Sequence, residues 1–243
     1  MFDLSGKTAL VTGSTQGIGF AIARLLAKQG ARVFVCGSEN MEKCKAASEK
    51  IENSTPVVAN LLKEDAADRL YEQTGDVDIL VLNASIQYKR DWDEFSVEEY
   101  DIQMNCNLKS SYLLIKKYAE GMKKKEWGRI VTIGSTNQYN QHPKLSLYGV
   151  SKAAQLKLVQ NIAPALAPYG ITVNNVAPGA INTPRNEKDL SDADFKKKVE
   201  GMIPCGYIGE AEDVSPAVLL LCSEEGRYIT GSDLKIDGGM SLK

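Results

Sequence analysis

The fold of this chain is decided by the stretch Thr8-Ala9-Leu10-Val11-Thr12-Gly13-Ser14-Thr15-Gln16-Gly17-Ile18-Gly19. Its first five residues are typical of a buried strand, and the apolar periodicity after Gly17 predicts a helix over residues 17–29. Glycines between a strand and a helix permit positive φ and close approach of a ligand to the backbone. The N–H groups and the dipole at a helix start favour a phosphate. The turn therefore predicts a dinucleotide site, although glycines that serve only packing give the same pattern.

Short apolar runs and longer amphipathic segments alternate along the rest of the chain. Further strands are expected at residues 32–36, 56–59, 78–82, 129–133, 171–176 and 233–236. Helices are expected at residues 41–52, 63–73, 96–123, 148–166 and 211–222, the fourth of them weakened by Pro164 and Pro168. Strands that alternate with helices pair in parallel through crossover connections. We therefore expect an α/β fold, a Rossmann-like doubly wound parallel sheet, in a single dinucleotide-binding catalytic domain over residues 1–243.

The segment 182–209 departs from this alternation. It is rich in charge, has weak periodicity and contains Pro184 and Pro204. A segment of this length in a compact domain is more often functional than a simple connection. We expect a helical substrate lid near residues 182–209.

The composition indicates which binding partners and which cellular compartment to expect. The chain of 243 residues has a net charge of -2, which gives no reason to expect a nucleic-acid partner or an anionic membrane surface. Its five cysteines are odd in number and lack a Cys-x-x-Cys pair, so we expect a reducing compartment and no zinc site. The chain shows no apolar signal core and no apolar run of the roughly 20 residues that a membrane span needs. A cytoplasmic protein with a small-molecule substrate, and with no metal, is the expectation.

The chemistry is indicated by Tyr148, Lys152 and Ser135. Tyr148 and Lys152 are four residues apart, so they share one face of the predicted helix. A nearby ammonium and a positively charged nicotinamide would lower the pKa of the phenol, which could then act as an acid or base. Ser135 follows a predicted strand and should emerge at its carboxyl end, where ligands bind in parallel sheets. The spacing of Tyr148 and Lys152 alone is common by chance, but its conjunction with Ser135 and the glycine turn is not.

Two other kinds of enzyme fit less well. A serine hydrolase needs a base and an orienting acid, whereas the only histidine is His142, beside Pro143, and no Gly-x-Ser-x-Gly elbow occurs. A metal enzyme needs clustered ligands, and no His, Cys or carboxylate cluster has ligand spacing.

These motifs together resemble the short-chain dehydrogenase/reductase family from about Leu4 to Gly239. The glycine motif matches at residues 12–19, and the family's Asn-Ala-Gly after the fourth strand appears as Asn83-Ala84-Ser85. The remaining matches are Asn107 in a helix, Ser135, Tyr148 with Lys152, the segment from Pro178-Gly179 to Thr183, and the C-terminal run from Ile229 to Gly239.

The resemblance implies roles for the matching residues. Tyr148 would be the general acid or base, Lys152 would hold the nicotinamide ribose and lower the pKa of Tyr148, and Ser135 would polarise the carbonyl. Asn107 would position a water for a proton relay, unless it is an ordinary buried helix residue. The cofactor would be contacted by Gly13, Ser14, Thr15, Gln16, Gly17, Ile18, Gly19, Ser38, Asn60, Leu61, Asn83, Ala84, Tyr148, Lys152, Pro178, Gly179, Ile181 and Thr183. Family members are usually homotetramers, so we expect a homotetramer built by the two long helices and the last strand.

Two positions near the expected cofactor site depart from the family pattern, and two residues at the end of the second strand bear on the choice between NADP(H) and NAD(H). Ser85 replaces the family's Gly, and Asn60 replaces an Asp that usually contacts adenine. The end of the second strand carries Ser38, which could donate to a 2′-phosphate, and Glu39, which could oppose one. The sequence favours NADP(H) over NAD(H).

The substrate is indicated only by the loops. Polar residues that could contact it are Ser135, Asn137, Gln138, Tyr139, His142, Tyr148 and Arg185. Buried amides are costly against an apolar substrate and satisfied by hydroxyls, so we expect a sugar, a polyol or another hydroxylated substrate. An alternative is a 3-oxoacyl thioester (acyl carrier protein) reductase, whose basic docking surface could only include Lys89, Arg90 and Arg185. A third alternative is a non-catalytic dinucleotide-binding protein.

Overall fold

The computed structural model describes residues 1–242, and a parallel sheet of seven strands forms its centre. The strand order is β3-β2-β1-β4-β5-β6-β9, and every neighbouring pair is parallel. The strands are β1 (Thr8–Thr12), β2 (Arg32–Gly37), β3 (Ser54–Val58), β4 (Ile79–Leu82), β5 (Gly128–Ile133), β6 (Ile171–Pro178) and β9 (Asp233–Ile236). A short second sheet pairs β7 (Ile181–Asn182) with β8 (Gly209–Glu210). The predicted doubly wound α/β fold is confirmed.

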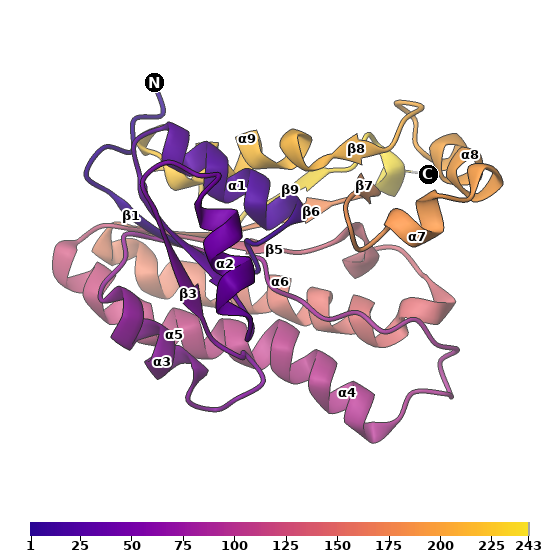
Figure 1. Ribbon diagram of the computed structural model, residues 1–243, viewed down its shortest axis with the longest axis horizontal. Helices are drawn as coiled ribbons and strands as arrows, with labels where there is room; N and C mark the ends of the chain where they lie inside the picture. Colours follow the sequence, from indigo (N-terminus) through magenta and orange to yellow (C-terminus); the bar gives the residue numbers. More distant parts are fainter. Residues whose placement is uncertain (243) are drawn as a thin grey trace.

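Helices cover both faces of this sheet (Figure 1). One face packs against α1 (Gly17–Lys28), α2 (Met41–Ser48) and α9 (Ala211–Cys222), and the other against α3 (Ala66–Thr74), α5 (Ser110–Lys125) and α6 (Ser146–Leu166). Successive strand residues point to opposite faces. Val11 therefore packs into the first layer and its neighbour Leu10 into the second, and both are fully buried. The near-continuous apolar strands follow from this double burial.

The sheet reverses its order at β1, which lies between β2 and β4. A crevice forms at such a point, at the carboxyl ends of the strands. Hydrogen bonds tie the two rims of the crevice together. The Thr12 hydroxyl accepts from the amides of Asn83 (3.0 Å) and Ala84 (3.1 Å). The Asn83 side chain donates to the carbonyls of Thr12 (3.0 Å) and Gly13 (2.9 Å). The glycine turn is thus held against the end of β4.

Two helices differ in detail from the sequence prediction. The predicted helix at residues 96–123 is built as α4 (Val97–Met104), a π-helical turn over Asn105–Lys109, and α5. Helix α6 continues through Pro164 to Leu166. Proline at 164 removes the hydrogen bond to the carbonyl of Gln160, a residue exposed to water, so the helix tolerates the loss.

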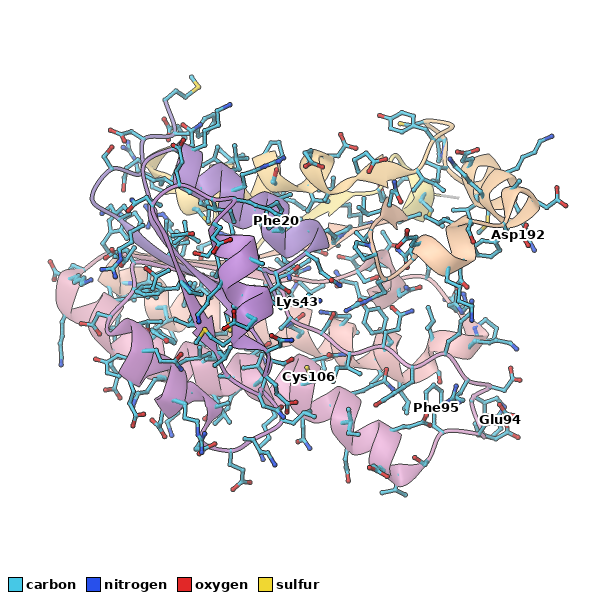
Figure 2. The ribbon with its side chains drawn as sticks, in the orientation of Figure 1. Phe20, Lys43, Glu94, Phe95, Cys106 and Asp192 are labelled. Atoms are coloured by element: carbon cyan, nitrogen blue, oxygen red, sulfur yellow. The ribbon has the colours of Figure 1, made fainter. Side chains whose placement is uncertain are left out.

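The predicted helical lid is confirmed as two helices, α7 (Glu187–Leu190) and α8 (Ala193–Met202). Both lie at one end of the molecule, shown in orange in Figure 1. Asp192, labelled in Figure 2, caps α8 by accepting from the amides of Asp194 (3.0 Å) and Phe195 (3.1 Å). Within residues 1–242, no helix combines the length and the apolar character that crossing a lipid bilayer requires.

The close packing of Gly19 in α1 against Gly13 and Asn83 can be tested by substitution. Replacing glycine by alanine inside a helix usually stabilises it by about 1 kcal/mol. A Cβ at Gly19 would clash with the carbonyl of Gly13 and the side-chain amide of Asn83. We expect Gly19→Ala to destabilise the protein by about 1–3 kcal/mol in urea unfolding.

Gly201 in α8 is the matched control, because nothing lies within 4 Å of the position that its Cβ would take. Gly201→Ala should stabilise the protein by about 0.5–1 kcal/mol. Equal stabilisation by the two substitutions would contradict the packing described here.

Candidate active site

A cleft with a volume of about 770 Å³ opens at the carboxyl ends of the parallel strands and extends under the lid. Its walls come from the glycine turn, the ends of β2, β4 and β5, the first turn of α6, the β6–β7 segment and the helices α7 and α8. This volume is typical of a site for a small molecule or cofactor.

The glycine turn forms one end of this cleft. Gly13 has φ 63° and Gly17 has φ 57°, a backbone conformation that glycine adopts readily. A Cβ at Gly17 would lie 3.5 Å from the Thr183 side chain, so the β6–β7 segment approaches the turn closely. Of the residues predicted to contact a cofactor, those that line the cleft are Gly13, Thr15, Gln16, Gly17, Ile18, Ser38, Asn60, Leu61, Asn83, Ala84, Tyr148, Pro178, Gly179, Ile181 and Thr183.

Two of the residues predicted to contact a cofactor lie behind the turn and do not line the cleft. The Ser14 hydroxyl donates to the carbonyl of Val11 (2.6 Å) and accepts from the amide of Cys36 (2.9 Å), while the Ser14 amide donates to the Cys36 carbonyl (3.0 Å). Gly19 packs against Gly13 and Asn83. Neither Ser14 nor Gly19 lines the cleft, because both are committed to holding the turn against its neighbouring strands.

Ser135 and Tyr148 meet at the other end of the cleft. Ser135 directly follows β5 and caps a 3₁₀ turn, its hydroxyl accepting from the Asn137 backbone amide at 3.2 Å. Tyr148 lies in the first turn of α6 and is buried. Burial raises the pKa of the Tyr148 phenol. The positive charge of Arg185, and hydrogen bonds from Ser135, Ser85 and Arg185, act in the opposite direction.

Lys152 lies one turn further along α6, almost fully buried and outside the wall of the cleft. Its ammonium donates to the carbonyl of Ile133 (2.7 Å) and to the side chain of Gln155 (3.2 Å), and lies 5.8 Å from the centre of the Tyr148 ring. Burial, reinforced by the positive charge of Arg185, lowers the pKa of Lys152 to about 7. In this arrangement Arg185 is the cation whose charge opposes the effect of burial on the pKa of Tyr148.

Asn107 is fully buried in the π-helical turn. Its side chain accepts from the Ile86 amide (2.8 Å) and donates to the Ile86 carbonyl (2.9 Å) and the Ser151 hydroxyl (3.0 Å). Its own carbonyl accepts from Gln155 (3.1 Å). The Gln155 side chain therefore links the Lys152 ammonium to the Asn107 carbonyl. The sequence offered one signal for Gln155, its position three residues after Lys152 on the same helix.

The predicted substrate residues divide into two groups. Ser135, Asn137, His142, Tyr148 and Arg185 line the cleft. Gln138 and Tyr139 do not line it. The Gln138 amide donates to Asp233 on β9 at 2.8 Å, and the Tyr139 ring lies 4.4 Å from the Lys235 ammonium. The 3₁₀ turn over Thr136–Gln138 directs these two side chains toward β9.

The rest of the substrate end combines a polar wall with an apolar cover. Further polar residues that line this end are Ser85, Gln87, Asn140, Gln141 and Asp189, of which only Asp189 had no signal in the sequence. The lid contributes Leu190, Phe195, Val199 and Met202. Arg185 spans the two walls, donating to the Ser85 hydroxyl (3.0 Å) and the Ser85 carbonyl (2.7 Å).

The end of the cleft beyond the glycine turn carries an unpredicted cation. Lys43 projects from α2 (Figure 2) and donates to the Gln16 side chain at 2.8 Å. The Glu39 carboxylate accepts from the Asn60 amide at 2.6 Å. Ser38, the residue before Glu39, also lines the cleft. Lys43 escaped the sequence analysis because it lies in the first turn of α2 and not at the end of β2.

Comparison with known proteins places these features in a family. The model of the family described as Enoyl-(Acyl carrier protein) reductase matches residues 13–241. The 3-oxoacyl-[acyl-carrier-protein] reductase FabG of Rickettsia prowazekii is 38% identical over 246 residues, which cover 100% of both chains.

Two solved structures are also similar over nearly their whole length. A 3-oxoacyl (acyl-carrier-protein) reductase from Agrobacterium tumefaciens C58, with NADP bound, has a TM-score of 0.94 and 32% identity and covers 98% of this chain and 95% of its own. A gluconate 5-dehydrogenase from Burkholderia cenocepacia, in complex with NADP and tartrate, has a TM-score of 0.93 and 29% identity and covers 100% of this chain and 98% of its own.

The matching fold, the matching length and the shared motifs exclude the alternative of an unrelated non-catalytic binding protein. The chain is an oxidoreductase that acts on CH–OH groups with a nicotinamide cofactor. It belongs to the short-chain dehydrogenase/reductase family.

Proposed function

We propose that this enzyme interconverts a carbonyl and a secondary alcohol in a polyhydroxylated small molecule, of the sugar or polyol class, with NADP(H). The observation that carries the proposal is the set of polar side chains that line the cleft together with Ser135 and Tyr148. Asn137, Asn140 and Gln87 are half-buried there, and Gln141 and His142 are exposed. Amides enclosed with an apolar substrate would lose hydrogen bonds to water without replacement, whereas hydroxyl groups would satisfy them. The gluconate 5-dehydrogenase among the similar structures supports this substrate class.

The residues of the cleft fit a dinucleotide. A side chain at Gly13 would lie 2.9 Å from the Cα atom of Ala84, and the positive φ of Gly17 lets the turn close beside Thr183. The start of α1 presents backbone N–H groups to a pyrophosphate. Leu61 and Asn60 lie at the adenosine end, and Ile181 and Thr183 at the nicotinamide end. When bound, the nicotinamide supplies or accepts the hydride.

We assign the proton chemistry to Ser135 and Tyr148. In reduction, the Ser135 hydroxyl donates a hydrogen bond to the carbonyl oxygen and polarises it. The Tyr148 phenol gives its proton to that oxygen as the carbon receives the hydride, so a ketone becomes a secondary alcohol. Oxidation runs through the same groups in reverse. Gln155 accepts from the Lys152 ammonium and donates to the Asn107 carbonyl. To hold the nicotinamide ribose, the role that the family resemblance implies, the Lys152 ammonium would turn from the Ile133 carbonyl toward the cleft.

The proposed preference for NADP(H) rests on charge at the adenosine end. Lys43 places an ammonium beside Gln16, and Ser38 offers a hydroxyl. A 2′-phosphate can pair with both groups. The Glu39 carboxylate, which would repel it, is held by Asn60. The NADP present in both similar structures supports the preference.

A second candidate function is reduction of a 3-oxoacyl thioester. The 38% identity to the Rickettsia FabG and the apolar lid residues favour it. The cations needed to dock an acidic carrier protein are engaged elsewhere, however. Lys89 pairs with Asp189 at 3.1 Å, Arg90 pairs with Glu99 at 3.0 Å, and Arg185 is turned onto Ser85. We therefore rank this function below the polyhydroxylated class.

We also propose that copies of the chain associate as a homotetramer. The helices that the family resemblance assigns to the interface carry exposed apolar side chains, among them Val97 (79% exposed) and Tyr100 on α4, Tyr112 on α5 and Val150 (55% exposed) on α6. Association would remove this apolar surface from water.

The substrate proposal is tested by steady-state assays of nicotinamide absorbance with a panel of sugars, polyols, sugar acids and 3-oxoacyl thioesters, each with NADP and with NAD. We expect kcat/KM for the best hydroxylated substrate to exceed that for any thioester by at least about 10-fold, because the enclosed amides discriminate by about 1–3 kcal/mol. NADP should give the lower KM. Faster turnover of the thioesters would favour the second candidate.

The burial of Lys152 predicts a pH-dependent stability. Its folded pKa of about 7 lies below the ordinary value of 10.5, so the unfolded chain binds more protons between these values. The cost of burying the ammonium is full below about pH 7 and is relieved as the pH rises. We expect the unfolding free energy of the wild type, minus that of Lys152→Met, to increase by up to about 1.4 kcal/mol per pH unit between pH 7 and 9.

Urea unfolding of the cofactor-free protein measures this difference. The exposed Lys124 on α5, replaced by Met, controls for the loss of one cationic side chain. A Lys152→Met difference that stays flat from pH 7 to 9 would show that the ammonium is not held in the environment described.

A further inference from the structure

Arg185 is fixed across the mouth of the substrate end. It belongs to the loop between β7 and α7, and its Nη1 and Nη2 atoms donate to the hydroxyl (3.0 Å) and the carbonyl (2.7 Å) of Ser85, which follows β4. Glycine, the residue that the family usually has in place of Ser85, would offer no hydroxyl. The bond to the hydroxyl therefore depends on a feature of this chain, whereas the bond to the carbonyl does not.

The guanidinium also lies beside the reacting phenol. The positive charge of Arg185 opposes the effect of burial on the pKa of Tyr148, and both side chains line the cleft. A guanidinium carries five N–H donors, and two of its N–H groups are bonded to Ser85. The side chain of Arg185 is exposed in the cleft, so its remaining donors can reach a bound ligand.

The charges at the substrate end do not cancel. The side chains there that are charged at neutral pH are Lys89, Asp189 and Arg185. Lys89 and Asp189 neutralise each other in an ion pair of 3.1 Å. Within residues 1–242, Arg185 takes part in no ion pair with a carboxylate. One positive charge remains beside the polar wall.

We propose that the substrate carries a carboxylate and that Arg185, oriented by Ser85, binds it. This inference rests on the proposed polyhydroxylated substrate and narrows it to the class of sugar acids. A planar guanidinium matches a carboxylate in shape and donor spacing. A single net charge balances a carboxylate and leaves half of a phosphate dianion uncompensated, so sugar phosphates are the poorer fit. Arg185 is thus a residue that determines specificity.

The experiment compares C4–C6 aldonates with the alditols of the same length and configuration, each oxidised with NADP. The wild type should prefer the aldonate by at least about 10-fold in kcat/KM. Arg185→Gln should lower kcat/KM for the aldonate about 30- to 100-fold, mainly through KM, because a charge-assisted hydrogen bond is lost. The same variant should lower kcat/KM for the alditol at least about 10-fold less than for the aldonate, because the loss of the Arg185 charge beside Tyr148 acts on both substrates alike, whereas the bond to a carboxylate exists only for the aldonate.

Three further variants separate charge from structure. Arg185→Lys should recover part of the preference for the aldonate, and Ser85→Gly should lose part of it. Lys188→Gln removes an exposed cation from the same helix, α7, outside the cleft, and should leave both substrates unchanged. Titration of protein fluorescence should give the same affinity for NADP in the wild type and in Arg185→Gln.

Other outcomes would overturn the inference. An equal loss on aldonate and alditol, or a weakened affinity for NADP, would show that Arg185 acts on Tyr148 or on the cofactor. Preference of the wild type for neutral sugars, or for a sugar phosphate over the aldonate, would also overturn it while leaving the proposed polyhydroxylated class intact. Turnover of 3-oxoacyl thioesters alone would instead overturn the proposed function itself.

Discussion

A buried ammonium without a carboxylate partner constrains the active site of this protein more than any other group. Lys152 is 1% exposed, and burial of a charge costs free energy unless hydrogen bonds compensate it. The Ile133 carbonyl at the end of β5 and the Gln155 side chain on α6 supply those bonds. The side-chain amide of Gln155 in turn needs acceptors, and it donates to the Asn107 carbonyl and the Ser111 hydroxyl, which hold it in place. The π-helical turn at Asn105–Lys109 places the Asn107 carbonyl within hydrogen-bond distance of the Gln155 amide. Such π turns inside helices are frequent at functional sites.

The two ends of the cleft are built from different parts of the chain. The dinucleotide end is made of backbone, held by Thr12, Asn83 and Ser14 in bonds that leave little freedom. The substrate end is made of side chains, with amides from the segment between Ser135 and Tyr148 on one side and apolar lid residues on the other. An apolar cover over a polar wall excludes water while leaving hydroxyl-binding groups in place.

Much of the fold was predictable because burial on both sheet faces gives continuous apolar strands, and β1, β5 and β6 fall within one or two residues of their predicted bounds. The positions of Ser135 and Tyr148 were predictable from spacing along one strand and one helix. The direction of a side chain in a turn was not, and Ser14, Gly19, Gln138 and Tyr139 therefore lie away from the cleft. Ser85, Gln155 and Lys43 gain their roles from partners 100, 48 and 27 residues away in sequence, which no local pattern reveals.

The central claim is that Tyr148 transfers the proton while the rest of the cleft only binds and orients. Single-turnover reduction of the best carbonyl substrate by Tyr148→Phe, together with titration of its NADP affinity, tests this claim most directly. The account predicts that turnover falls by at least about 10²-fold, because the general acid is lost, and that cofactor affinity stays within about twofold of the wild type. Turnover that survives the substitution would contradict it, since a buried phenyl ring has no proton to give.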